Sequence, residues 1–121
     1  MKKSPLILSS ILLAVTANVW AGHDDDQRIM AAAAKHPVTV AQAKKLGDET
    51  AVSVTGTIVR QVKHEHYELK DASGTIVVDI DEKLATAAQL KAGTKVKILG
   101  EVDTHKHRPT DIDAVKVEFI K

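Results

Sequence analysis

Apolar residues recur at every second position over most of residues 51–121, which is the period of a β-strand with one buried face. The first run alternates three apolar residues with polar ones: Val52, Val54 and Ile58. Four further strands are expected over residues 66–70, 75–80, 95–102 and 111–120. Gly56 and Gly100 fall inside the first and fourth runs, where a bulge or a bend lets a long strand curve. This pattern predicts an all-β fold.

Two short helices are expected beside the strands. Thr39 is placed to cap a helix before the first strand, with Val40, Ala43 and Leu46 on its buried face. Asp81 is placed to cap another between strands three and four, which presents a stripe of Leu84, Ala87, Ala88 and Leu90. Five strands with a helix after the third close most naturally into a five-stranded OB-fold barrel. The competing fold is an open β-sandwich, which would leave the edges of five short strands exposed.

The first 21 residues have the features of a secretory signal peptide. A basic start precedes an apolar run over residues 6–17, which is too short for a membrane anchor. We expect cleavage after Ala21, with Ala17 as the alternative, and export to a bacterial periplasm without a membrane span. Residues 22–37 are expected to form a linker or marginal helix that Pro37 ends, and residues 38–121 the OB-fold domain.

The composition excludes several classes of protein. The absence of cysteine rules out a disulfide framework, a thiolate zinc site and a thiol nucleophile. There is neither a nucleophile motif nor a phosphate-binding glycine loop, so we expect no enzymatic activity and no required cofactor. Nucleic-acid binding is excluded because the net charge is +1 and aromatic residues make up 2% of the sequence. Tyr67 and Phe119 are both placed like core residues.

Histidine is the most unusual residue type in this sequence. Four of the six histidines form two His-x-His pairs, which are His64 with His66 and His105 with His107. In an OB-fold barrel these pairs fall on the loops that join strands one and two and strands four and five, and both loops flank one binding face. Four converging imidazoles would bind Zn, Cu or Ni, with Asp103 and Glu65 as nearby carboxylates. The alternative is that they are solvated loop residues.

Acidic residues are also frequent on the predicted strands. They are Asp79, Asp81, Glu101, Asp103, Asp111 and Asp113. Their spacing matches no EF-hand loop, so we interpret them as a solvated strand surface with Asp81 as a helix cap.

Several segments resemble the bacterial OB-fold (BOF) family of small periplasmic proteins of the YgiW/YdeI type. The most specific are Lys-Asp-Ala-Ser-Gly-Thr-Ile at residues 70–76 and Val-Asp-Ile-Asp at residues 78–81. The resemblance covers residues 38–121 and implies a binding protein, not an enzyme, that contributes to tolerance of oxidant, metal, acid or cationic-peptide stress. The family often carries Trp after the third strand and between strands four and five. Here residues 82–85 and 104–108 contain none, which weakens a sugar-stacking role.

Two functions follow from these observations. The first is an envelope binding protein whose ligand lies in the cleft between the two loops. A cell-wall fragment, a small molecule or an envelope protein would fit this cleft. We expect a monomer by default. The residues expected to contact this ligand are Lys63, Tyr67, Asp103, Lys106 and Arg108. The alternative is a periplasmic metal-binding protein that holds Zn, Cu or Ni through the paired histidines His64, His66, His105 and His107.

Overall fold

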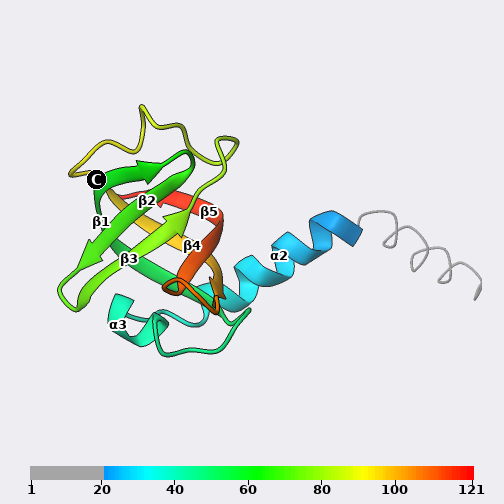
Figure 1. Ribbon diagram of the computed structural model, residues 1–121. Helices are drawn as coiled ribbons and strands as arrows, with labels where there is room; N and C mark the ends of the chain where they lie inside the picture. Colours follow the sequence, from blue (N-terminus) through cyan, green and yellow to red (C-terminus); the bar gives the residue numbers. More distant parts are fainter. Residues whose placement is uncertain (1–20) are drawn as a thin grey trace, which may run out of the picture.

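The computed structural model describes residues 21–121 and contains five strands and two helices (Figure 1). The helices are α2 (Ala21–Ala34) and α3 (Val40–Ala43). The strands are β1 (Ala51–Lys63), β2 (His66–Asp71), β3 (Gly74–Asp79), β4 (Lys95–Asp103) and β5 (Asp111–Phe119). No helix among the described residues is long and apolar enough to cross a membrane.

The strands form a closed barrel in the order β1-β2-β3-β5-β4, which confirms the predicted five-stranded OB-fold. All neighbouring strands are antiparallel except β3 and β5, which run parallel. Gly100 stands at a register shift between β4 and β5, where a Cβ atom would lie 2.2 Å from the carbonyl oxygen of Asp113. Gly56 is similarly close to β2, with 2.6 Å to the carbonyl oxygen of Lys70. Glycine is therefore required by the close approach of neighbouring strands at both bends.

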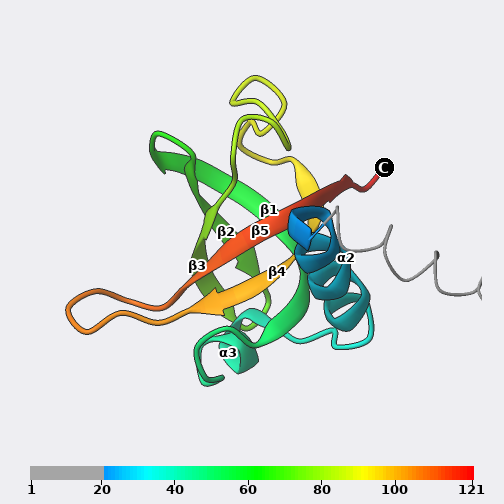
Figure 2. The same cartoon turned by 90° about the vertical axis from the view of Figure 1, so that its right-hand side faces the viewer.

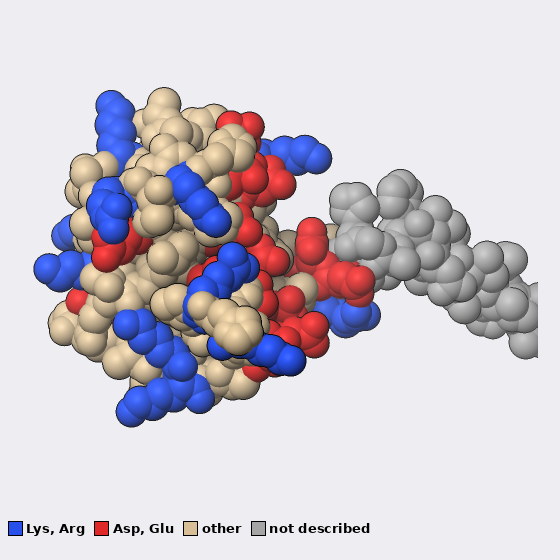
Figure 3. Space-filling model, viewed as in Figure 1, with Lys and Arg blue, Asp and Glu red and all other residues tan. Residues whose placement is uncertain are grey.

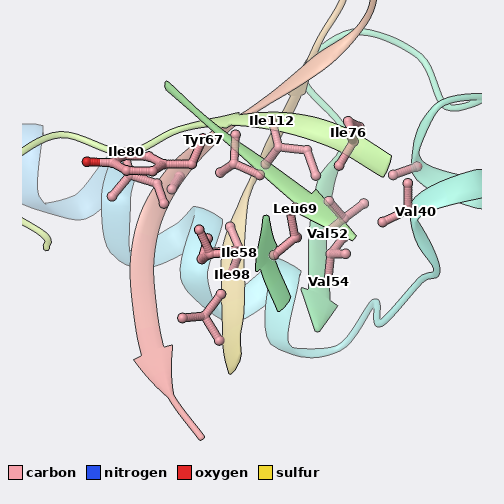
Figure 4. Close-up of a cluster of buried hydrophobic side chains, with 14 of the residues drawn as sticks. Val40, Val52, Val54, Ile58, Tyr67, Leu69, Ile76, Ile80, Ile98 and Ile112 are labelled. Atoms are coloured by element: carbon pink, nitrogen blue, oxygen red, sulfur yellow. The ribbon is translucent and has the colours of Figure 1, made fainter. Parts of the chain in front are cut away.

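The core fills the barrel with β-branched and leucine side chains from all five strands, as their alternation predicts (Figure 4). Ile58, Leu69 and Ile112 are fully buried, and the ring of Tyr67 is 2% exposed. Phe119 was expected in this core, and that prediction is wrong because the side chain is 44% exposed. Its cross-strand partner Val96 is fully buried, but Phe119 is the last residue of β5, and the residues that follow it are exposed as well, so its ring is left partly uncovered.

The segment between β3 and β4 corrects a second expectation. Residues 80–94 form separate turns and not the helix that Asp81 was expected to cap. The reason lies at Thr86, whose N–H donates to the side chain of Gln89 (2.9 Å) and whose hydroxyl accepts from the Gln89 N–H (3.3 Å). This reciprocal cap starts a new turn and interrupts the first one. Each turn buries one apolar anchor, Ala85 in the first and Leu90 in the second.

The chain before β1 lies against the barrel. The segment interpreted as a linker or marginal helix contains the 14-residue helix α2, which packs against β1 and β4 and buries Ala33 completely (Figure 2). Residues 36–38 then exchange hydrogen bonds with Ser53 of β1. Thr39 caps α3 as expected, in a capping box with Gln42. The predicted signal peptide lies outside the described residues, except for Ala21.

Candidate functional site

A groove of about 340 Å³ lies on the outer side of β2 and β3. The end of β1 and the loop between β4 and β5 flank it, so it occupies the face on which OB-folds bind their ligands. Its lining residues come from five parts of the chain: Lys44, Val62, Lys63, Glu68, Thr75, Ile76, Val77, Arg108, Pro109, Thr110 and Asp111. The cleft predicted between these two loops is present.

The groove combines apolar walls with unneutralised positive charge. Val62, Val77 and Pro109 supply apolar surface. The carboxylate of Glu68 accepts a hydrogen bond from Arg60 at 2.9 Å, so its charge is compensated from outside the groove. The second lining carboxylate, Asp111, lies 3.2 Å from the Nε2 atom of His105. Among the side chains that the structure describes, by contrast, the ammonium groups of the two lining lysines, at positions 44 and 63, have no carboxylate within 4.0 Å. The arrangement suits an anionic ligand with an apolar part.

Asp71 fixes the position of α3, and α3 leads directly into Lys44. One carboxylate oxygen of Asp71 accepts from the N–H of Val40 at 2.9 Å; the other accepts from the N–H and hydroxyl of Ser73 and the N–H of Gly74. Desolvation acts to raise the pKa of Asp71, but these hydrogen bonds outweigh it and hold the pKa below its ordinary value. The hairpin between β2 and β3 is thereby fastened to α3.

Four of the five residues predicted to contact the ligand fall into three groups. Lys63 and Arg108 line the groove. Lys106 is exposed on the same loop as Arg108 but does not line the groove. Tyr67 is buried in the core and offers no stacking face; its pKa is raised by burial and then by the nearby Glu82 and Glu65.

The sequence analysis did not predict five polar residues that line the groove, namely Lys44, Glu68, Thr75, Thr110 and Asp111. For Glu68 and Thr75 a signal exists, since they occupy outward positions in the alternation of β2 and β3. Lys44 follows α3, and its approach to β3 is a tertiary contact that no local pattern encodes.

The two histidine pairs do not meet in one cluster. Among the described residues, the sets of metal-ligating atoms that lie within 4.8 Å of one another are His64 with Glu65 and Glu82, and His105 with Asp103 and Asp111. The first set surrounds the β1–β2 turn, where the N–H of Glu82 donates to Glu65 at 2.9 Å. The second closes the base of the β4–β5 loop and includes Asp103, the remaining residue expected to contact the ligand. His66 and His107 belong to neither set.

An acidic surface runs across β3, β5 and β4. Asp113 of β5 pairs with Asp79 on β3 and with Glu101 on β4. Two residues earlier on β5, on the same face of the sheet, Asp111 pairs with Asp103. The pKa of Asp113 is raised by partial desolvation and then by repulsion from neighbouring carboxylates, Asp79 foremost. The pKa of Glu101 is raised by the same two causes. Figure 3 shows Asp and Glu side chains gathered in a band on the side of the barrel from which α2 projects.

Comparisons with known proteins agree with this architecture. Residues 13–119 match the family model described as bacterial OB fold (BOF) protein. The calcium-regulated OB-fold protein CarO of Pseudomonas aeruginosa is 38% identical over 80 residues, which are 65% of this chain and 69% of CarO. The protein YgiW of Escherichia coli K12 is 46% identical over 65 residues, which cover 54% of this chain and half the length of YgiW.

Solved structures extend the comparison to the fold. The structure of YgiW from E. coli superposes with a TM-score of 0.63 at 38% identity and covers 69% of this chain and 88% of that chain. The telomere capping protein Ten1 from Schizosaccharomyces pombe has a TM-score of 0.55 at 13% identity, with 69% and 78% coverage. At that identity the likeness shows a shared barrel and nothing about function.

Proposed function

The chain belongs to the bacterial OB-fold (BOF) family, and from that premise we propose that it is a non-enzymatic binding protein of the periplasm that contributes to envelope stress tolerance. Its ligand lies in the groove between the β1–β2 turn and the β4–β5 loop. The observation that carries this proposal is the groove itself, which has apolar walls and three lining cations, Lys44, Lys63 and Arg108. Export rests on the signal peptide expected over residues 1–21.

The groove favours a ligand that carries carboxylates. Arg108 can hold a carboxylate with two parallel hydrogen bonds, and the two lysines add point charges beside it. None of the lining residues is aromatic, so stacking on a sugar ring has no support there. Among cell-wall fragments, we therefore propose that the acidic peptide of a muramyl peptide is the recognised part, with its small aliphatic side chains against the apolar wall.

A titration followed by amide chemical shifts tests this proposal. The labelled protein is titrated with a soluble muramyl peptide and, separately, with the neutral sugar chitotriose. The muramyl peptide should shift the amides of Lys63, Thr75 and Arg108. The K63A/R108A variant should bind it at least roughly tenfold more weakly, since each lost charge-assisted hydrogen bond contributes more than 1 kcal/mol.

The matched control is K91A/K95A, which removes the same charge from exposed positions outside the groove. An equal loss in both variants would show that general electrostatic attraction drives binding. Equal binding of chitotriose would show that the sugar, and not the peptide, is recognised. Unshifted groove amides would contradict the location of the site.

The cellular role requires a separate test. A deletion strain should lose survival under peroxide, acid or cationic-peptide challenge, and the wild-type gene should restore it. The K63A/R108A gene should not, while K91A/K95A should. Amino-terminal sequencing of the periplasmic protein should begin at Gly22. Full rescue by the K63A/R108A gene would show that stress tolerance does not depend on ligand binding in the groove.

A further inference from the structure

His105, Asp103 and Asp111 converge at the base of the β4–β5 loop, beside the groove. The Nε2 atom of His105 lies 3.2 Å from a carboxylate oxygen of Asp111 and 3.7 Å from one of Asp103. The side chains of His105 and Asp111 are only 17% and 11% exposed, so the surrounding chain restricts their positions. We propose that these three residues bind a divalent transition-metal ion, for which zinc is the probe.

The distances between the ligating atoms fit such a site. Zinc lies about 2.0–2.2 Å from nitrogen and oxygen ligands, so two ligands of one ion are separated by roughly 3.0–3.5 Å at octahedral to tetrahedral angles. The observed separations of 3.2 and 3.7 Å require only small side-chain adjustments. One imidazole and two carboxylates leave the remaining coordination positions to water or to a groove ligand.

The charges around His105 favour a cation. Asp103 and Asp111 are direct cross-strand partners, an arrangement in which two like charges destabilise a sheet. Asp113 and Glu101 extend the same acidic surface in the next row. An imidazole nitrogen among carboxylates suits zinc, manganese or nickel, whereas calcium prefers six to eight oxygen ligands and gains nothing from histidine.

Arg108 links this cluster to the groove. Its Nη2 atom lies 3.3 Å from the Nδ1 atom of His105, and a guanidinium group can only donate. Nδ1 is therefore the acceptor in this contact, and Nε2 is the nitrogen that donates its proton toward Asp111. A metal ion on Nε2 moves that proton to Nδ1, which can then no longer accept from Arg108. Metal binding thus releases the guanidinium group of Arg108, which lines the groove.

Zinc titration of the purified protein tests the site without any groove ligand, so its outcome is independent of the proposed function. We expect one zinc ion per chain, with the imidazole signals of His105 shifting at stoichiometric metal. H105A and D111N should each weaken zinc binding at least roughly tenfold, by the loss of a ligand. H107A and D113N are the matched controls, since they alter the same loop and the same strand outside the cluster; their Kd should stay within about threefold of the wild-type value. Far-UV circular dichroism verifies that each variant is folded.

R108A should change the zinc affinity in the opposite direction to H105A and D111N. Removal of the adjacent positive charge and of the hydrogen bond to Nδ1 should tighten zinc binding by roughly two- to tenfold. An equal loss of zinc affinity in D111N and D113N would show that zinc is attracted to the acidic surface as a counterion and is not coordinated. Competition by calcium as strong as that by zinc itself would show the same. A loss in H107A as large as that in H105A would assign the ligands to the His-x-His pair instead. Weaker zinc binding in R108A would overturn the tautomer argument.

Discussion

Substitution of Asp71 by Asn tests how the β2–β3 hairpin holds α3. The carboxylate accepts four hydrogen bonds, one through Oδ2 from the Val40 N–H and three through Oδ1 from Ser73 and Gly74. Asparagine has the same shape but only one acceptor oxygen. If that oxygen keeps the three bonds to the hairpin, the amide nitrogen faces the Val40 N–H, and two donors oppose each other.

The magnitude follows from the lost bond. A hydrogen bond to a charged group contributes about 1.5–3 kcal/mol, and the three remaining bonds weaken when the charge is removed. We therefore expect D71N to lower the free energy of unfolding by about 2–3 kcal/mol at pH 7. For a domain of this size that corresponds to a Tm lower by roughly 10–20 °C.

Urea unfolding followed by circular dichroism at pH 7 and at pH 3 measures this effect and its pH dependence. The pKa of Asp71 is lower in the folded than in the unfolded protein, so its stabilising contribution is present above the unfolded value of about 3.9. That contribution is lost as the pH falls through the folded pKa, and the difference between wild type and D71N should shrink at pH 3. A cost below about 0.5 kcal/mol at pH 7, or a difference that does not depend on pH, would refute the reasoning.

Other substitutions test the acidic surface, the bend in β4 and the docking of α2. D113N should stabilise the protein at pH 7 by up to about 0.5 kcal/mol, since it relieves repulsion between carboxylates on an exposed surface. Because the pKa of Asp113 is raised in the folded protein, this gain should fade as the pH falls through that pKa. A loss of stability in urea unfolding at pH 7 would contradict the repulsion. G100A should destabilise the protein by about 3 kcal/mol, because the new Cβ would overlap the backbone of Asp113. The control G47A, with open space around the new Cβ, should leave the stability nearly unchanged. Equal unfolding midpoints for the two variants would contradict the close approach at Gly100. A33E should cost at least about 2 kcal/mol by placing an unpaired charge where α2 meets the barrel, and an unchanged Tm would show that α2 does not dock.

The strands could be predicted from the sequence because each has one face in the core. Val52, Val54 and Ile58 are all fully buried, and their two-residue period needs no tertiary information. The helix expected after Asp81 failed for a local reason, since Thr86 and Gln89 cap each other and interrupt it. The prediction for Phe119 failed because this residue ends β5 and is left partly uncovered opposite the buried Val96, which alternation along the strand cannot reveal.

The groove could be predicted because the order of strands in an OB-fold determines which loops flank the binding face. Lys63 ends β1 next to the first of these loops, and Arg108 lies on the second. Which histidines meet was beyond the sequence, because it depends on register. His66 pairs with Asp79 on β3, whereas Asp111, the partner of His105, pairs with Val77. Because β3 and β5 are parallel, the β4–β5 loop lies near the beginning of β3, whereas the β1–β2 turn lies near its end. The two histidine pairs therefore contact different carboxylates. The spacing within each His-x-His pair therefore carries little information about the cluster, and the cross-strand pairing of Asp103 with Asp111 determines it.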